Sequence, residues 1–172
     1  GEYWMGSAKE YSSSLFVTIG TGVGAGVIVD GKPLCGYNGA AAELGHLPVV
    51  EDEQEYCNCG KKGCLEQVAS ATGIVRTATR MLNESEEPSS LRDIPYISAK
   101  VVFDEAKAGD LIALNVVDYV CRYLGKGIAC AAGMVDPEVI SIGGGVSAAG
   151  EFLLIRISKY YKEYVFHASR NT

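Results

Sequence analysis

No apolar run in the 172-residue sequence approaches the roughly 20 residues that a helix needs to cross a membrane. The N-terminus also lacks a basic segment followed by an apolar one, so we expect no secretory signal. Lysine and arginine form no runs, and the formal net charge of −6 argues against a nucleic-acid-binding surface. We therefore expect neither a membrane partner nor a nucleic-acid partner.

The composition otherwise fits an ordinary globular protein. Hydrophobic residues make up 48% of the chain and charged residues 21%, and 172 residues suffice to bury the core of one domain. The 21 glycines exceed the usual share. Because they cluster at a few turns, they indicate backbone requirements and not low complexity.

Histidine is scarce, but one of the two histidines precedes a group of three cysteines, and the potential metal ligands are His46, Cys57, Cys59 and Cys64. Three cysteines with one histidine are a standard ligand set for tetrahedral structural zinc. Gly60 and Gly63 let the backbone bend tightly enough to bring the thiolates together. A disulfide is less favoured, because Cys57 and Cys59 are too close for easy bridging and three is an odd number. The sequence therefore predicts a zinc-binding loop over residues 46–64.

A zinc ion with four protein ligands has no open position for water, so this site is expected to be structural and not hydrolytic. It would fasten the segment of Glu43 and His46 to the segment of Cys64 and Glu66. Carboxylates on such a frame can accept hydrogen bonds from several hydroxyl groups at once. Glu43 and Glu66 are therefore candidate ligand-binding residues; the alternative is that they are solvated surface carboxylates.

The remaining cysteines indicate a reducing compartment. Cys121 and Cys130 lie in an apolar helical pattern, where a free cysteine behaves as a small hydrophobic residue. Cys35 follows a strand and has no evident partner. Because no disulfide framework is implied, we expect a cytoplasmic location.

The order of predicted elements is that of a mixed α/β domain. β-branched and apolar runs predict strands at residues 15–19, 27–32, 47–50 and 138–142, with Asp30-Gly31 as a hairpin turn within the second run. Apolar residues at helical spacing predict helices at 65–82, 98–108 and 110–135, and another after residue 145. Residues 1–6 are typical of the end of a helix, and residues 83–95 of a surface loop.

Two glycine-rich turns follow predicted strands. The first, Gly20-Thr21-Gly22-Val23-Gly24-Ala25-Gly26, joins strand to strand. A dinucleotide-binding loop must open a helix and a P-loop must end in Gly-Lys-Ser or Gly-Lys-Thr, so neither motif fits. The second, Gly143-Gly144-Gly145, is expected between a strand and a helix N-terminus, which is a place for an anion or a nucleotide. From the residues alone, the first turn could also be a plain turn without a ligand.

The pattern Glu43-x-Gly45-His46, followed by Cys57-x-Cys59-Gly60-x-x-Gly63-Cys64-x-Glu66, resembles the signature of the ROK family. This family contains bacterial glucokinases, other hexose and amino-sugar kinases, and sugar-responsive repressors. The resemblance implies an α/β fold: an actin-like ATPase (ribonuclease H-like) lobe with a mixed sheet flanked by helices and a zinc-binding loop. Residues 1–172 would be the C-terminal lobe of a two-lobed sugar kinase. The N-terminal lobe, with its catalytic aspartate, is expected to be absent from this chain.

By the same resemblance, the intact protein phosphorylates a hexose with Mg-ATP, most often glucose to glucose 6-phosphate, while zinc remains structural. The implied sugar-binding residues are Glu43, His46 and Glu66, with His46 using one nitrogen for zinc and the other toward the sugar. The implied nucleotide-binding residues are Gly20, Thr21, Gly22 and Gly24 at the phosphates, and Gly143, Gly144 and Gly145 at the adenosine. Lacking the aspartate base, the chain alone is expected to phosphorylate nothing measurable. The intact protein is expected to be a homodimer.

Two other functions fit the same residues. The chain could be the sugar-sensing lobe of a ROK transcriptional repressor, or a zinc-stabilised binding module without chemistry. The Gly-Thr-Gly-x-Gly-x-Gly turn favours the kinase, because a pure sensor has no need to cradle phosphates.

Overall fold

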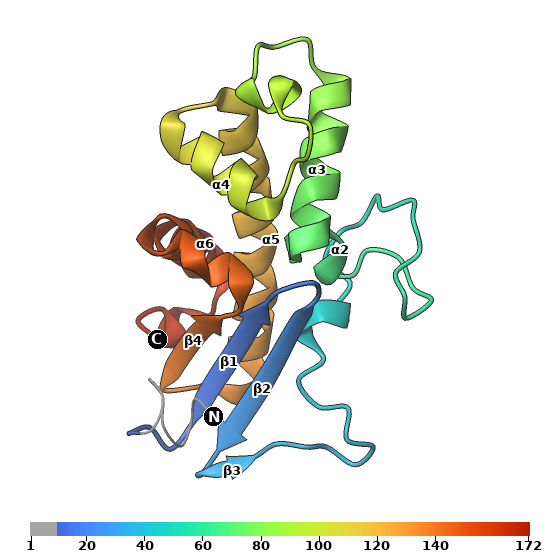
Figure 1. Ribbon diagram of the computed structural model, residues 1–172. Helices are drawn as coiled ribbons and strands as arrows, with labels where there is room; N and C mark the ends of the chain where they lie inside the picture. Colours follow the sequence, from blue (N-terminus) through green and yellow to red (C-terminus); the bar gives the residue numbers. More distant parts are fainter. Residues whose placement is uncertain (1–9) are drawn as a thin grey trace.

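The computed structural model describes residues 10–172, so the helix end predicted for residues 1–6 lies outside the described residues. The strands are β1 (Ser14–Ile19), β2 (Val23–Val29), β3 (Lys32–Pro33) and β4 (Val139–Gly143). They form one sheet in the order β3-β2-β1-β4 (Figure 1). Strand β1 is antiparallel to β2 and parallel to β4, so the sheet is mixed, as predicted.

Strand β1 forms the middle of the core because its alternate side chains are apolar. Leu15, Val17 and Ile19 are at most 1% exposed, whereas Phe16 and Thr18 lie half-buried on the opposite face of the sheet. Burying an aliphatic side chain of this size contributes about 2 kcal/mol. The strand is thereby fixed in register, since a slip by one residue would turn the apolar set outward.

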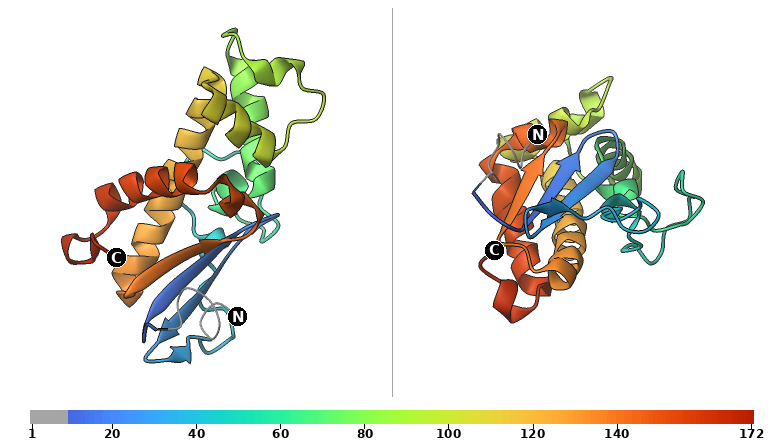
Figure 2. Two further views of the ribbon diagram at one scale, coloured as in Figure 1. Left: turned by 60° about the vertical axis from the view of Figure 1, so that its left-hand side comes forward. Right: turned by 90° about the horizontal axis from the view of Figure 1, so that it is seen from below.

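Five α-helices lie within the described residues: α2 (Glu66–Ala69), α3 (Ala71–Glu84), α4 (Ala99–Ala108), α5 (Leu111–Val135) and α6 (Glu151–Tyr164). Short 3-10 helices are η1 (Leu44–His46), η2 (Ser90–Asp93), η3 (Gly145–Ala149) and η4 (His167–Ser169). Helix α5 crosses one face of the sheet and contacts α3, α4 and α6 (Figures 1 and 2).

Helix α5 is bounded by two aspartates. The Asp110 side chain caps its start by accepting a hydrogen bond from the Ala113 N–H at 2.9 Å. Asp136 ends it in the left-handed conformation, with φ of 44°. At Gly125 an added Cβ would lie 2.6 Å from the Tyr160 Cβ, so the glycine is what lets α6 pack closely on α5. Within residues 10–172, no helix is both long and apolar enough to span a membrane.

The structure corrects the predicted boundaries. Strand β2 begins at Val23, so Gly24 and Gly26 belong to the strand, and the turn itself is Gly20-Thr21-Gly22. The helix predicted for residues 65–82 is interrupted at Ser70, whose side chain caps α3 by accepting from the Gly73 N–H.

Three further predictions were wrong in part. Residues 47–50 contribute a single bridge, Pro48 to Cys64, and not a strand. The loop at 83–95 is not all surface, because α3 continues to Glu84 and Leu91 is 1% exposed. The second glycine turn does not open a helix directly, because η3 comes before α6.

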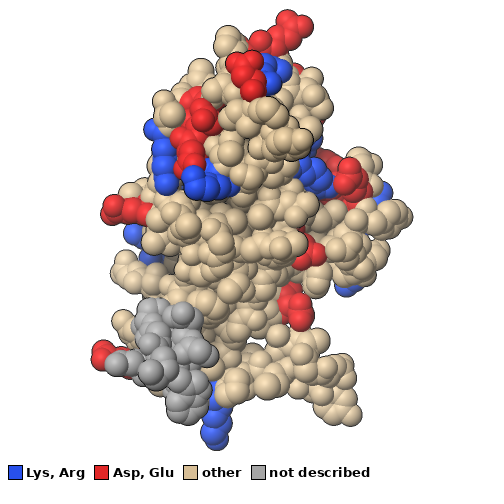
Figure 3. Space-filling model, in the orientation of Figure 1, with Lys and Arg blue, Asp and Glu red and all other residues tan. Residues whose placement is uncertain are grey.

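Charged side chains are distributed unevenly over the face drawn in Figure 3. They gather over the helical end of the molecule and along its edges, with acidic and basic groups interspersed. Fewer charged side chains are visible over the part of the sheet that the grey residues leave uncovered.

Candidate functional site

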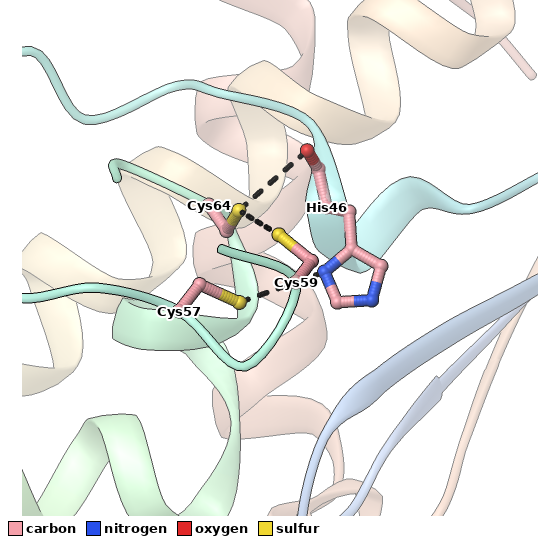
Figure 4. A group of neighbouring side chains, drawn as sticks. All are labelled: His46, Cys57, Cys59 and Cys64. Carbon is pink, nitrogen blue, oxygen red and sulfur yellow. Dashed lines mark hydrogen bonds between the residues drawn. The ribbon is translucent and has the colours of Figure 1, made fainter. Parts of the chain in front are cut away.

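The predicted metal ligands meet in one place. The ligand atoms of His46, Cys57, Cys59 and Cys64 all lie within 4.8 Å of one another (Figure 4). The Cys57 Sγ is 3.6 Å from the His46 Nδ1, and the Cys59 Sγ is 3.5 Å from the Cys64 Sγ. Bonds of about 2.3 Å to sulfur and about 2.0 Å to nitrogen place the ligands of a tetrahedral zinc roughly 3.5–3.8 Å apart. The donor set and its spacing therefore fit zinc.

Two glycines make this geometry possible. An added Cβ at Gly45 would lie 2.0 Å from the Val23 carbonyl oxygen, so η1 packs directly on the start of β2. Gly63 has φ of 80°, and its Cβ would lie 2.1 Å from the Val50 carbonyl oxygen. The Gly63 carbonyl accepts the N–H groups of Val49 and Val50 at 2.8 and 3.1 Å, which fastens the cysteine loop beside the segment that follows His46.

The cysteines differ in their protonation behaviour. Burial raises the pKa of the Cys64 thiol to about 12, and its neighbours Cys59 and Cys57 add to this. Burial also raises the pKa of Cys57, whereas the backbone N–H of Lys61 lowers the pKa of the exposed Cys59. A metal ion binds the thiolate forms, so loading this cluster releases protons and supplies the positive charge that keeps the sulfurs ionised.

Glu66 stands between the cysteine cluster and the first glycine turn. It opens α2, and its Oε1 accepts a hydrogen bond from the Cys57 Sγ at 3.1 Å and lies 3.6 Å from the His46 Nδ1. On the other side, an added Cβ at Gly22 would lie 2.9 Å from the Glu66 Oε2. The glycine turn is therefore in contact range of a carboxylate that also borders the cysteine cluster.

The first glycine turn is closed by its own backbone. The Gly20 N–H donates to the Gly22 carbonyl at 2.9 Å, and the Gly20 carbonyl accepts from the Ala71 N–H at 2.8 Å, which ties the turn to the start of α3. Thr21 is exposed at its tip. A hollow of about 330 Å³ lies beside it, lined by Thr21 and Gly22 together with Glu66 and Ser70. This volume suits a small ligand.

The other predicted sugar residues lie outside this hollow. Glu43 precedes η1 and is exposed, while His46 ends η1 and directs its Nδ1 toward Cys57. The structure thus brings His46, Glu66 and the turn together and leaves Glu43 at the opposite end of η1.

The second glycine turn lies at the same end of the sheet as the first. Gly143 ends β4 and pairs with Thr18, one residue before the end of β1. Gly144 has φ of 88°, and an added Cβ would lie 2.5 Å from the Ile19 carbonyl oxygen. Because β1 and β4 are parallel, both turns follow carboxyl ends of neighbouring strands, where α/β sheets commonly bind ligands.

Replacing Gly144 with alanine should destabilise the protein strongly. The methyl group would meet the backbone of Ile19 in a conformation that alanine disfavours, so we expect a loss of about 3 kcal/mol in the free energy of unfolding. Gly145→Ala is the matched control, because no atom lies within 4 Å of its added Cβ. Denaturant unfolding of both variants tests this; equal stabilities would contradict it.

A second attachment of the cysteine loop, through Arg76, leaves no pattern in the sequence. Arg76 of α3 donates to the Glu55 carboxylate at 3.0 Å and to the Gln67 carbonyl at 2.9 Å, and it also pairs with Glu53. The Gln67 side chain in turn accepts from the Cys64 N–H and donates to the Glu55 carbonyl, both at 3.0 Å. Glu53 is half-buried. Burial raises its pKa, but the hydrogen bond and charge of Arg76 outweigh this and hold the pKa below its ordinary value.

Arg76→Ala should loosen the cysteine loop. We expect a loss of about 1–2 kcal/mol in the free energy of unfolding, a modest figure because Glu55 is largely exposed and solvent screens that pair. Zinc should pass to a chelator several-fold faster, since residues 53–57 would no longer be tied to α3. Arg76→Lys should recover part of both effects. Zinc transfer at wild-type speed in the alanine variant would rule out this role.

The fold and the site together define the class of this protein. It is an α/β lobe with a mixed sheet, flanked by helices, of the actin-like ATPase kind, and it carries a possible zinc site. The chain belongs to the ROK family, whose family model matches residues 1–172. The predicted family and fold class are thereby confirmed.

Known relatives include kinases and a regulator. The chain is 46% identical to a glucokinase of Halalkalibacterium halodurans over 95% of its own length and 51% of that protein. It is also similar to the structure of a ROK glucokinase from Streptomyces griseus in complex with glucose and AMPPNP. The two chains have a TM-score of 0.85 and are 31% identical, and the match covers 99% of this chain and 56% of that chain.

A transcriptional regulator is equally similar in structure. This ROK protein, a homologue of the Escherichia coli MLC protein, has a TM-score of 0.86 and 34% identity, with 98% of this chain and 42% of that chain covered. The chain spans about half the length of the curated glucokinases it matches.

Proposed function

We propose that residues 1–172 form the C-terminal lobe of an ATP-dependent hexose kinase whose substrate is glucose. One observation carries this proposal: the carboxylate of Glu66, which opens α2 two residues after Cys64 of the cysteine cluster, lies against Gly22 of the first glycine turn. A carboxylate that accepts sugar hydroxyls next to a turn that can cradle phosphates is the juxtaposition that phosphoryl transfer to a sugar requires.

In this proposal the carboxylates of Glu43 and Glu66 accept hydrogen bonds from sugar hydroxyls. His46 binds zinc through Nδ1, the nitrogen that lies 3.6 Å from the Cys57 Sγ, and turns its other nitrogen toward the sugar. When bound by His46 and the three cysteines, zinc has no open position and supplies only rigidity. The side-chain positions then depend on the cluster and not on a catalytic metal.

The nucleotide would lie along the edge where the two glycine turns meet. Thr21 and Gly22 would donate backbone N–H groups to the phosphates, and Gly20, whose N–H is already donated to the Gly22 carbonyl, would face them with its bare Cα. Gly24 lies in β2 and pairs with Thr18 of β1. Because Gly24 has no side chain, the Thr18 hydroxyl is left uncovered; an added Cβ at Gly24 would lie 3.0 Å from the Thr18 Oγ1. The adenosine would lie by Gly143, Gly144 and Gly145.

The reaction would be in-line transfer of the γ-phosphoryl group of Mg-ATP to a sugar hydroxyl. The hydroxyl proton goes to an aspartate that the other lobe supplies. This chain binds and orients both substrates, so alone it should phosphorylate nothing measurable. We further propose a cytoplasmic location, since none of the six cysteines forms a disulfide in the structure. The proposed intact protein is a homodimer with no nucleic-acid or membrane partner.

The sugar-sensing lobe of a repressor is the second candidate, favoured by the regulator structure at a TM-score of 0.86. An assay of ADP formation by the full-length parent protein distinguishes the kinase from the repressor. It uses ATP with a panel of glucose, fructose, N-acetylglucosamine and N-acetylmannosamine. We expect ADP formation to depend on hexose and to be greatest with glucose. Sugar binding without any ADP formation would favour the repressor instead.

A further inference from the structure

A second, larger hollow lies apart from the cysteine cluster. It has a volume of about 720 Å³ and lies between α3, α5, the end of α6 and the loop at residues 49–55. Volumes of roughly 300–1,000 Å³ are typical of small-molecule sites. Neither the sugar nor the nucleotide of the proposed function uses this space.

Three cations line the hollow without a carboxylate partner. They are Arg80 of α3 and Arg122 and Lys126 of α5. Within residues 10–172, the ion pairs of arginine and lysine are those of Arg76 and Lys100, so none of the three has a carboxylate oxygen within 4 Å. This is unexpected in a chain with a net charge of −6, which has acidic groups to spare. The acidic groups that face them from further away are Glu84, one turn from Arg80, and Asp118 and Glu163, which line an adjoining hollow with Arg122.

Neutral groups hold the three cations in place. The Arg80 guanidinium lies 5.1 Å from the centre of the Tyr119 ring, and the Arg122 Nε donates to the Tyr164 hydroxyl at 3.1 Å. The Lys126 Nζ donates to the Val49 carbonyl at 3.4 Å. Each cation therefore keeps its full charge while losing part of its freedom, which is the condition for preorganised anion binding.

The helix α5 presents these groups on one face. Tyr119, Arg122, Tyr123 and Lys126 follow at spacings of three and four residues, so they form one stripe along the helix. The rings of Tyr119 and Tyr123 contact edge-to-face with centroids 4.9 Å apart, and Arg80 of α3 lies over the Tyr119 ring.

Acidic groups also border the hollow and limit its affinity. Glu51, Asp52 and Glu84 are exposed at its rim, and Glu84 lies one helical turn from Arg80. Glu53 and Glu55 are already paired with Arg76. Arg80 and Arg122 are exposed and Lys126 is half-buried, so the cations and these carboxylates share the mouth of the hollow. The three cations without an ion pair favour a compact anion over an extended acidic surface.

We propose that this hollow binds a small, multiply charged anion of the phosphate class. Guanidinium groups match phosphate oxygens with paired hydrogen bonds, and the ammonium of Lys126 adds a point charge. The ligand is either free phosphate or a phosphorylated small molecule, and inorganic phosphate serves as the probe for both.

Titration of the isotope-labelled, zinc-loaded chain with inorganic phosphate tests the proposal by amide NMR. We expect saturable shifts at residues 119–126, separate from any shifts at the glycine turn, residues 20–22. The double variant Arg122→Gln/Lys126→Gln should weaken the first set roughly tenfold or more, because two charged contacts are lost. The control Lys107→Gln/Lys162→Gln removes the same charge from exposed positions outside the hollow and should bind as the wild type does.

A variant that binds phosphate more tightly than the wild type distinguishes an effect on the site from an effect on folding, because misfolding would weaken binding. The double variant Glu51→Gln/Asp52→Gln removes rim repulsion and should bind phosphate about twofold more tightly. Titration with a phosphorylated hexose separates the two sources of the anion: tighter binding than phosphate at residues 119–126 identifies a phosphorylated small molecule, and equal binding identifies phosphate itself.

Three results would overturn the proposal. The first is the absence of saturable shifts at residues 119–126. The second is equally weakened phosphate binding in Arg122→Gln/Lys126→Gln and in the control Lys107→Gln/Lys162→Gln. The third is a set of shifts at residues 119–126 that appears when the protein concentration is raised without phosphate. The last result would mean that a second copy of the chain occupies the hollow.

Discussion

Replacing Glu66 with glutamine in the full-length parent protein should lower kcat/KM for the hexose by roughly 10- to 100-fold. The amide keeps the size of the side chain but loses the charge that strengthens its hydrogen bonds to sugar hydroxyls, a difference of about 1.5–3 kcal/mol. The loss should appear mostly as a higher KM for the sugar, with KM for ATP little changed. Initial rates at varied hexose and ATP concentrations measure both.

Two comparisons make the Glu66 result specific. Glu86→Gln removes the same charge from an exposed position in the loop after α3 and should leave the kinetics unchanged. The zinc content of Glu66→Gln should also equal that of the wild type, because Glu66 is not a member of the ligand set. A variant that keeps kcat/KM within twofold of the wild type would remove Glu66 from the sugar site.

Replacing Cys59 with serine should cost the protein its zinc and much of its stability. Cys59 is exposed, so its substitution changes packing little, and the effect reports the metal. We expect a loss of about 4 kcal/mol in the free energy of unfolding, which corresponds to a Tm lower by roughly 10 °C in a chain of this size. Stripping zinc from the wild-type chain with a chelator should lower Tm by a similar amount.

Cys35→Ser is the matched control for Cys59→Ser, since Cys35 is also exposed but lies outside the cluster. It should change Tm by no more than about 1 °C. Calorimetry of both variants with measured zinc content provides the test. Equal Tm values for Cys59→Ser and the wild type, at full loss of zinc, would show that the metal does not hold the loop.

Much of the fold followed from local patterns in the sequence. Strands β1 and β4 are short β-branched runs, and the caps of α4 and α5 are side chains that satisfy N–H groups nearby in the chain, so both were predictable. The ligand cluster was predictable as well, because Cys57, Cys59 and Cys64 are close in sequence and glycines between them force the bend.

The features that the sequence did not reveal depend on contacts between residues far apart in the chain. Glycine is a poor strand residue, so Gly24 and Gly26 suggested a longer turn than the one that exists. They join β2 because Thr18 and Phe16 of β1 pair with them. The interaction of Arg76 with Glu53 and Glu55 spans more than twenty residues and leaves no local pattern.

The position of Glu66 shows how the site combines both kinds of information. The position of Glu66 two residues after Cys64 could be read from the sequence, but its contact with Gly22 could not. That contact depends on the bond from the Ala71 N–H to the Gly20 carbonyl, which joins the turn to the start of α3. The zinc loop and the glycine turn, which are separate motifs in the sequence, therefore share one carboxylate in the structure.

X-ray absorption at the zinc edge of the chain, purified without chelators, tests the central claim most directly, because it reports whether His46 and the three cysteines bind a metal beside Glu66. We predict one zinc per chain with three sulfur ligands at about 2.3 Å and one nitrogen ligand at about 2.0 Å. Protein without zinc, or zinc bound by oxygen in place of the His46 nitrogen or any of the three sulfurs, would contradict the account.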